Sequence, residues 1–206
     1  MNKENKLIPG LPSGFKDRWN KKLILKKKLI NVIENNFIKF GFEPLETPSF
    51  EISENIGSFL ADDESNPMSD VFSFKDGEKN ITLRYDLSSP LARFVAQNNQ
   101  DLPLPYKRYA IQNVFRNEKA GNARYREFTQ ADCDIVGNVN PAQANVQLCH
   151  FIYSTILRCR LKKDQFVINI SNRKIIQGLI EDLKISKDKE IKVMRAIDKL
   201  DKPGFG

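Results

Sequence analysis

The chain has 206 residues, of which 40% are hydrophobic and 29% are charged, as in a globular protein large enough to bury a core without disulfides or a metal. No apolar stretch approaches the roughly 18–20 residues that cross a bilayer, and the N-terminus lacks the apolar run of a signal peptide. The formal net charge of +7 favours anionic partners such as phosphates and nucleic acids, although an excess of lysine can also serve solubility alone.

The first part of the chain predicts a long helix, a strand and a hairpin. A helix is predicted over residues 17–40, where apolar residues recur at spacings of three, four and seven before Gly41. These apolar residues are Trp19, Leu23, Ile30, Ile33, Phe37 and Phe40. Residues 42–51 (FEPLETPSFE) predict a strand that its two prolines place at an edge or an interface. Residues 71–85 predict a hairpin that turns at Asp76-Gly77.

The rest of the chain alternates helices with strands. A short helix is predicted from Ser88, because Pro90 would occupy its first turn. Residues 107–116 and 123–137 predict two strands joined by a loop, and Pro141 begins another helix. Residues 166–170 (FVINI) predict a buried strand, followed by two short helices to about residue 200. Runs of strands flanked by helices predict an α+β fold with an antiparallel sheet.

The strand predicted over residues 123–137 carries polar residues where a buried strand should be apolar. Because strand side chains alternate, one face combines two arginines, a ring, an amide and two carboxylates. These residues are Arg124, Arg126, Phe128, Gln130, Asp132 and Asp134. The cationic end suits a nucleotide, and the anionic end suits an ammonium group or a protonatable ring. The alternative is a solvent-exposed face with internal ion pairs, since unpaired buried charges are costly.

Several segments resemble one enzyme family in the right order along the chain. FRNEKAGNARYREF resembles motif 2 of the class II aminoacyl-tRNA synthetases, which has the form FRxE, a loop, then R-x-x-x-F. Those positions are Phe115, Arg116, Glu118, Arg124 and Phe128. The continuation RYREFTQADCDIVG, the upstream LRYDLSSPLARFVA and the opening LPSGFKDRW resemble the histidyl-tRNA synthetases in particular. Residues 41–51 resemble motif 1, the dimer-forming helix and strand that end at a proline, here Pro48.

The resemblance implies an ATP site in which ATP is a substrate accompanied by Mg²⁺. Arg116 would bind the α-phosphate and the carboxylate of histidine, which makes it the implied catalytic residue. Glu118 would accept from the adenine amino group, Arg124 would reach the outer phosphates, and Phe128 would stack on adenine. The substrate carboxylate attacks phosphorus directly, so catalysis would rest on positioning and charge neutralisation.

The resemblance also implies a histidine pocket beside the ATP site. Its implied members are Asp86, Leu87, Ser88, Arg116, Gln130 and Asp134. Asp86 and Gln130 suit the α-ammonium group, and Asp134 suits an imidazole N–H. Hydrogen bonds of this kind discriminate strongly, because a wrong ligand leaves buried polar groups unpaired. On spacing alone, Asp86 would instead be a helix-capping or salt-bridging residue.

The implied protein is a cytoplasmic homodimer that acts on L-histidine, ATP and tRNA(His), away from membranes. Residues 1–206 would form a class II catalytic domain that is incomplete at its C-terminus. The second histidine signature of the family, motif 3 and the anticodon-binding domain are not found in the sequence, so we expect this chain alone to be inactive. Two alternatives remain. One is a non-catalytic regulatory subunit of ATP phosphoribosyltransferase, which generally lacks a complete motif 2, and the other is a dimerisation or nucleic-acid-binding module.

Four weaker features favour structural interpretations. His150 is the only histidine, and a lone histidine on a helix is usually structural. The acidic cluster at residues 62–64 could attract Mg²⁺, but a solvated loop is favoured. The lysine run at residues 21–28 predicts a solvent-facing side of the first helix. The three cysteines, Cys133, Cys149 and Cys159, have no CxxC spacing and predict reduced thiols rather than a disulfide or zinc site.

Overall fold

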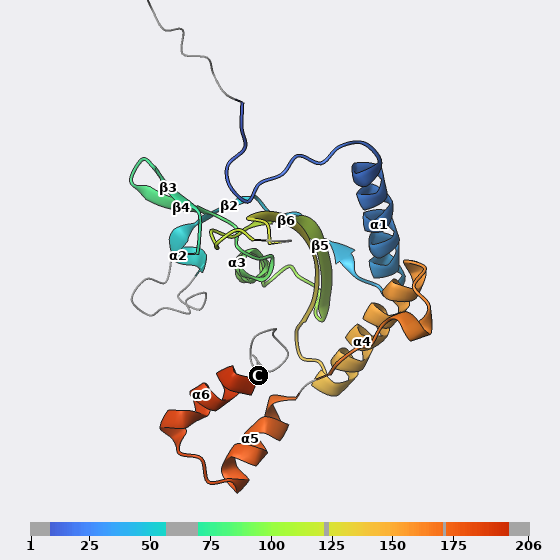
Figure 1. The fold of residues 1–206 in the computed structure, drawn as a ribbon, viewed down its shortest axis with the longest axis vertical. Coiled ribbons are helices and arrows are strands. Elements are labelled where there is room, and N and C mark those ends of the chain that lie inside the picture. Colours follow the sequence, from blue (N-terminus) through green and yellow to red (C-terminus); the bar gives the residue numbers. More distant parts are fainter. Residues whose placement is uncertain (1–8, 57–69, 122–123, 171, 198–206) are drawn as a thin grey trace, which may run out of the picture. The chain divides into compact units, whose positions relative to one another are not determined.

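The computed structural model describes residues 9–56, 70–121, 124–170 and 172–197. It divides into two compact units, Met1–Lys163 and Asp164–Gly206. The first unit contains every described strand and the helices α1 to α4, and the second contains α5 and α6 (Figure 1). No helix in these described ranges is both long and apolar enough to cross a bilayer.

Helix α1 spans Asn20–Lys39 and begins later than the apolar spacing predicts. Asn20 has a positive φ of 59°, which breaks the helical path, so Trp19 precedes the helix. The predicted place of Trp19 in the apolar stripe is therefore wrong, and its side chain is 73% exposed. Phe37 is buried as predicted. Gly41 follows the helix with φ +74°, a conformation that glycine adopts without steric cost.

Residues 42–51 form two short strands in different sheets, where one strand was predicted. Strand β1 (Glu43–Pro44) pairs in parallel with β5, and β2 (Phe50–Ile52) pairs antiparallel with β4. The prediction of an edge position is confirmed, because β1 lies at the end of its sheet. The chain changes sheets near Pro48, since a proline cannot donate to a ladder. Helix α2 (Ser53–Ile56) follows.

The predicted hairpin is present as β3 (Ser73–Asp76) and β4 (Lys79–Leu83). Gly77 in its turn has a positive φ of 60°. With β2, the hairpin forms an antiparallel sheet in the order β2-β4-β3. Helix α3 (Ser88–Asn98) begins at the predicted residue.

The second sheet carries the long strands β5 (Tyr106–Phe115) and β6 (Glu127–Val136) in the order β1-β5-β6. Strand β6 begins at Glu127, so the connection from β5 is longer than predicted. The long strands are antiparallel, with Gln112 opposite Gln130. The α+β class and its antiparallel pairing are confirmed, and the parallel pair of β1 with β5 was not foreseen.

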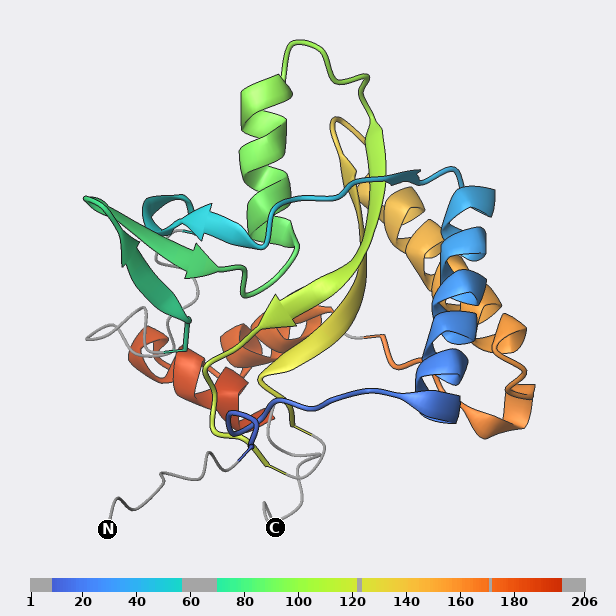
Figure 2. The same ribbon diagram turned by 90° about the horizontal axis from the view of Figure 1, so that it is seen from above.

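Helices cover the two faces of β5 and β6 differently (Figure 2). Helices α1 and α4 (Pro141–Arg158) lie on one face, over a core cluster of Phe37, Phe42, Tyr109 and Phe151. The ring of Phe37 stacks on Tyr109 at 4.9 Å and on Phe151 at 4.3 Å between centroids. Helix α3 lies on the opposite face, where Leu87, Ala110 and Val114 are buried together with Phe128 against them. Gln130, Asp132 and Asp134 of β6 also lie on this second face.

The second unit contains α5 (Arg173–Asp182) and α6 (Lys187–Ile197), as predicted, and the one-turn helix η2 (Lys163–Gln165) lies at its start. The predicted buried strand at residues 166–170 is wrong. These residues form no strand, and Val167 and Ile170 are 81% and 76% exposed. A strand requires neighbours for its backbone N–H and C=O groups, and no described strand pairs with this segment.

Candidate nucleotide and amino-acid binding site

The predicted polar face of β6 is continued by β5 into one surface on the α3 side of the sheet. Residues directly opposite in an antiparallel pair project to the same side. The five pairs on this side are Val114 with Phe128, Gln112 with Gln130, Ala110 with Asp132, Arg108 with Asp134, and Tyr106 with Val136. The predicted order from aromatic to amide to anionic groups therefore exists along the face, but Arg124 and Arg126, which were predicted to form its cationic end, precede β6.

Arg116 lies at the aromatic end of this face, next to two rings. Its guanidinium carbon is 4.5 Å from the centroid of Tyr85 and 5.1 Å from that of Phe128. Its Nε donates to the carbonyl oxygen of Tyr85 at 3.3 Å. These contacts hold the cation over the rings, where cation–π attraction adds to positioning. Tyr85 was missed among the candidate residues, although it directly precedes Asp86.

Glu118 connects Tyr85 to Arg124. The Tyr85 hydroxyl donates to Glu118 Oε1 at 2.9 Å, and Arg124 forms an ion pair with the other carboxylate oxygen. Burial raises the pKa of Tyr85, and the hydrogen bond to Glu118 raises it further, so the phenol remains a donor. The Arg124 side chain is 66% exposed, whereas that of Glu118 is mostly covered. The residues predicted to bind adenine and outer phosphates thus pair with each other here.

Arg126 fastens the N-terminal segment to the connection between β5 and β6. Its Nε donates to the carbonyl of Glu118 at 2.9 Å, and its backbone N–H donates to the carbonyl of Gly14 at 2.8 Å. Gly14 has φ +84°, and a Cβ there would lie 2.7 Å from the Arg126 side chain. The segment therefore needs glycine both for its conformation and for the close approach.

The anionic end of the face is organised by Arg108, whose side chain has no exposed area. Its Nη2 lies 2.9 Å from Asp132 Oδ2, 2.7 Å from Asp134 Oδ2 and 2.8 Å from the carbonyl of Leu87. The pKa of Asp134 is raised, mainly by burial, while Arg108 opposes this and the charges of Asp132 and Asp86 add to it. Arg108 was missed, although its even spacing from Gln112 and Val114 places it on the same face.

Three predicted members of the histidine pocket lie at the start of α3. Asp86 Oδ1 accepts from the backbone N–H of Ser89 at 3.1 Å, which is the capping contact expected from spacing alone. Leu87 is buried in the core and offers its carbonyl oxygen to Arg108. Ser88 is exposed at the first position of the helix.

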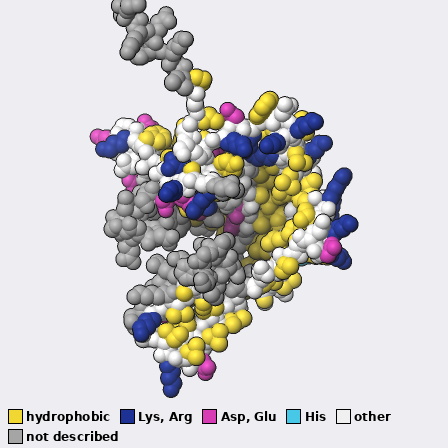
Figure 3. All heavy atoms as spheres, viewed as in Figure 1, with side chains coloured by type: hydrophobic (Ala, Val, Ile, Leu, Met, Phe, Trp, Pro, Cys, Tyr) yellow, Lys and Arg dark blue, Asp and Glu magenta, His cyan; other side chains and the backbone are white. Residues whose placement is uncertain are grey.

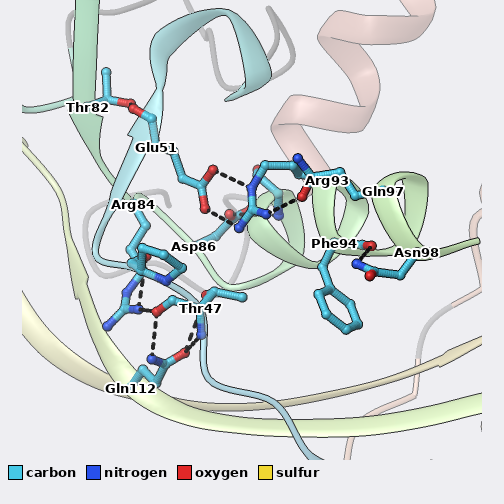
Figure 4. A network of polar contacts seen from close by, with 12 residues as sticks. Thr47, Glu51, Thr82, Arg84, Asp86, Arg93, Phe94, Gln97, Asn98 and Gln112 are labelled. Carbon is cyan, nitrogen blue, oxygen red and sulfur yellow. Dashed lines mark hydrogen bonds and ion pairs between the residues drawn. The ribbon is translucent and has the colours of Figure 1, made fainter. Parts of the chain in front are cut away.

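A polar network fixes the segment that carries Tyr85 and Asp86 (Figure 4). Arg84 is buried, and it donates to the carbonyls of Asn113 at 2.6 Å and Thr47 at 2.7 Å. Arg93 of α3 binds both oxygens of Glu51 in β2, at 2.7 and 2.9 Å. Bidentate pairs of this kind restrict orientation as well as distance. The network therefore joins the β2-β4-β3 sheet to α3 and β5.

The weaker candidates have ordinary surroundings. The acidic cluster at residues 62–64 lies outside the described residues, and no group of three or more His, Cys, Asp or Glu gathers as a metal site within them. His150 packs edge-on against Phe40 at 5.3 Å. The lysines at residues 21, 22, 27 and 28 are exposed, but Lys26 donates to Thr129 of β6, and burial lowers its pKa. The three cysteines are free.

Comparison with protein families and curated sequences gives consistent matches. The family model described as histidyl-tRNA synthetase matches residues 14–205. The histidine–tRNA ligase of Pelagibacter ubique (strain HTCC1062) is 85% identical over 206 residues, which are all of this chain and 44% of that protein. The histidine–tRNA ligase of Rhodopseudomonas palustris (strain TIE-1) is 41% identical, over 98% of this chain and 40% of that protein. The chain therefore spans less than half the length of these relatives.

Solved structures show the same likeness. A histidyl-tRNA synthetase from Nostoc sp. PCC 7120 matches with a TM-score of 0.78 and 29% identity, over 93% of this chain and 43% of that chain. A Bacillus halodurans protein described as an ATP phosphoribosyltransferase regulatory subunit/histidyl-tRNA synthetase has a TM-score of 0.64 and 23% identity, over 79% of this chain and 40% of that chain. This second likeness concerns the fold alone.

Proposed function

The chain belongs to the histidyl-tRNA synthetase family, and on this premise we propose that it forms part of a histidine–tRNA ligase. In the proposed reaction, a carboxylate oxygen of L-histidine attacks the α-phosphorus of ATP and pyrophosphate leaves. A ribose hydroxyl of tRNA(His) then attacks the carbonyl carbon of the adenylate, and AMP leaves. The assignment of residues 1–206 to one catalytic domain is part of this proposal.

The position of Arg116 is the observation that carries the proposal. Its guanidinium is held by Tyr85 and Phe128 at the aromatic end of the face. A cation there can contact an α-phosphate and a carboxylate together, and it offsets the negative charge that develops as they react. Because the rings already fix the guanidinium, little reorganisation is needed when the substrates bind.

The pair of Glu118 and Arg124 supports a nucleotide site that opens when ATP binds. Arg124 is mostly exposed, so its side chain can turn from Glu118 toward the outer phosphates. Glu118 would then accept from the adenine amino group while Phe128 offers its ring to the base. Mg²⁺ would enter with the ATP phosphates, since the described residues provide no cluster that could hold it alone.

The anionic end supports recognition of histidine. Three carboxylates, those of Asp86, Asp132 and Asp134, interact electrostatically there. Asp86 and Gln130 would bind the α-ammonium group, and Asp134 would accept from an imidazole N–H. A site of this type rejects ligands that lack the matching N–H groups, because its buried carboxylates would remain unpaired.

A homodimer in the cytoplasm is the proposed assembly and location. Apolar side chains gather on the surface over α1 and α4 (Figure 3). In α1, the apolar residues Ile24, Leu25, Leu29 and Ile38 are substantially exposed. Exposed apolar side chains on a helix that adjoins the motif 1 segment suit contact with a second copy.

A regulatory subunit of ATP phosphoribosyltransferase is the second candidate, favoured by the likeness of fold to the Bacillus halodurans protein. Against it stands a complete motif 2, because Arg116, Glu118 and Phe128 all occupy coherent positions on one face. Charging of tRNA(His) by a protein that carries this chain at the full length of its relatives would exclude this candidate. It would equally exclude a module without activity.

The deciding experiment is histidine-dependent exchange of pyrophosphate into ATP by that full-length protein. Arg116→Ala should abolish exchange, because the charge at the reacting phosphate is no longer offset. The control is Arg158→Ala, which removes an exposed arginine at the end of α4 and should leave exchange unchanged. Exchange near the unmodified level in Arg116→Ala would contradict the mechanism.

A further inference from the structure

A single nitrogen of Arg108 is shared by three oxygen atoms at the anionic end of the site. Two belong to the carboxylates of Asp132 and Asp134, and the third is the carbonyl of Leu87 at the start of α3. The contact with Asp132 and that with Leu87 are aligned hydrogen bonds, whereas Asp134 approaches at 2.7 Å without such alignment. Arg108 thus ties together β5, β6 and the segment that bears Asp86.

The side chain of Arg108 is completely buried, yet it is only partly used. Its Nε and Nη1 find no hydrogen-bond partner among the described residues. Buried donors without acceptors are costly, so a side chain that served packing alone would be better replaced by an aliphatic one. Asp134 Oδ2 is likewise buried without an aligned donor in the described part of the chain. An incompletely satisfied polar cluster of this kind requires an explanation other than packing, and a role in binding is one such explanation.

The charges around Asp134 are unbalanced. Asp132 on the same strand and Asp86 before α3 both repel its negative charge, and Arg108 is the cation that offsets them. The other charged group of α3 near this region, Arg93, is already paired with Glu51. Lys107 and Cys133 lie on the opposite face of the sheet, where Lys107 donates to the carbonyl of Phe40.

We propose that Arg108 is a positioning residue for histidine: it holds Asp132 and Asp134 side by side as carboxylates, so that Asp134 faces the imidazole as a hydrogen-bond acceptor. This inference deepens the proposed function and rests on it. A protonated Asp134 would present an O–H and prefer an imidazole nitrogen without hydrogen. Arg108 therefore selects which form of the histidine ring the pocket accepts, without touching the ring itself.

The rigid, planar guanidinium of arginine suits this task better than the flexible ammonium group of a lysine. Nη2 alone contacts the two carboxylates and the carbonyl, and the buried guanidinium holds that nitrogen in one position. A lysine would supply the charge as a point but would not fix both carboxylates in one orientation. Removal of the charge would leave Asp132 and Asp134 as like charges in a half-buried site, which favours uptake of a proton.

The test uses a protein that carries this chain at the full length of its relatives and measures histidine-dependent ATP–pyrophosphate exchange over a range of pH. Arg108→Met should raise KM for histidine by about tenfold or more near neutral pH, because Asp134 loses the group that holds it as an acceptor. KM for ATP should change by no more than about twofold, since the aromatic end is untouched. The acid limb of kcat/KM for histidine should move to higher pH.

Two further variants separate positioning from folding. Arg108→Lys should retain the pH profile but weaken histidine binding, because the charge remains and the rigid guanidinium is lost. The double variant Arg108→Met with Asp132→Asn removes one charge of each sign, and it should return the acid limb toward the unmodified profile. Arg158→Met is the control, because it removes an exposed arginine at the end of α4, outside the site, and should leave the pH profile of histidine use unchanged.

Each outcome has a defined meaning. An unchanged KM for histidine and an unchanged pH profile in Arg108→Met would overturn the inference, as would equal losses for histidine and ATP without a shift of the acid limb. If Arg108→Met does not fold, the double variant and Arg108→Lys decide by the same criteria. An unmodified protein without histidine-dependent exchange would instead reject the proposed function.

Discussion

Tyr85 and Glu118 are joined by a 2.9 Å hydrogen bond that links two of the sequence segments that resemble known synthetases. Tyr85 belongs to the segment before α3, and Glu118 belongs to the motif 2 connection. The same tyrosine ring lies beside Arg116. One side chain therefore orients both the guanidinium that would act on the α-phosphate and the carboxylate that would recognise adenine.

Substitution of Tyr85 should separate these two tasks. Tyr85→Phe keeps the ring beside Arg116 but removes the donor to Glu118, so KM for ATP should rise severalfold while kcat changes little. A hydrogen bond to a charged group contributes about 1.5–3 kcal/mol, and partial exposure reduces this figure. Tyr85→Ala should lower kcat as well, because the guanidinium loses its support. Equal effects of the two variants on pyrophosphate exchange would show that the hydroxyl, not the ring, supports Arg116.

Arg124→Ala should weaken ATP binding without destabilising the fold. The pair with Glu118 is largely exposed on the arginine side, and exposed pairs contribute only about 0–1 kcal/mol to stability. We expect an unchanged melting temperature for the 206-residue chain and a raised KM for ATP in the full-length protein. KM for histidine is the internal control and should stay constant. A large drop in melting temperature would instead assign Arg124 a structural role.

Asp134→Asn should stabilise the chain at neutral pH while it weakens histidine binding. The pKa of Asp134 is raised by burial in the folded state, so the folded state binds its proton more tightly than the unfolded state does. Stability is then lost as pH rises from the unfolded pKa of about 3.9 through the raised folded pKa. Asparagine carries no charge and avoids that loss.

Thermal unfolding of the 206-residue chain at neutral and acidic pH tests this sign. The gain in melting temperature from Asp134→Asn should be present at neutral pH and disappear as the pH falls toward about 3.9. A lower melting temperature at neutral pH would mean that attraction to Arg108 outweighs the cost of burial. The coupled loss of histidine affinity would be an instance of function maintained at the expense of stability.

Gly14→Ala should detach the N-terminal segment from Arg126. Its φ of +84° is unfavourable for alanine, and the added Cβ would lie 2.7 Å from the Arg126 side chain. We expect destabilisation of about 1–3 kcal/mol, read as a lower melting temperature. Gly10→Ala is the matched control, because nothing lies within 4 Å of the Cβ it would introduce. Equal melting temperatures for both variants would show that the Arg126 side chain can move away from the added Cβ without loss of stability.

The sequence predicted elements well where a local signal determines them. The period of apolar residues around Phe37 predicted α1, the Asp76-Gly77 turn predicted the hairpin, and the alternation through Phe128 and Asp134 predicted the polar face. Predictions were wrong where the structure of a segment depends on residues distant in the sequence or on a backbone break that the spacing does not reveal. Residues 166–170 have a strand pattern but form no ladder with a described strand, and Trp19 continues a spacing that the backbone at Asn20 interrupts.

The candidate site shows the same division. Resemblance identified Arg116, Glu118 and Phe128, and the structure brings them to one side of the sheet. Arg108 carried a usable signal, its even spacing on β5, but a lone arginine in an apolar strand reveals its partners only when the register with β6 is known. The contact of Tyr85 with Glu118 depends on two segments that meet only in the fold.

Side chains along β5 and β6 alternate between the two faces of the sheet. Even-numbered positions such as Arg108 and Asp134 face the site, and odd-numbered positions such as Tyr109 and Cys133 face the core under α1 and α4. Insertion or deletion of one residue within either strand would move the side chains beyond that point to the opposite face of the sheet. We therefore expect homologous proteins to place insertions and deletions between Phe115 and Glu127 rather than within β5 or β6.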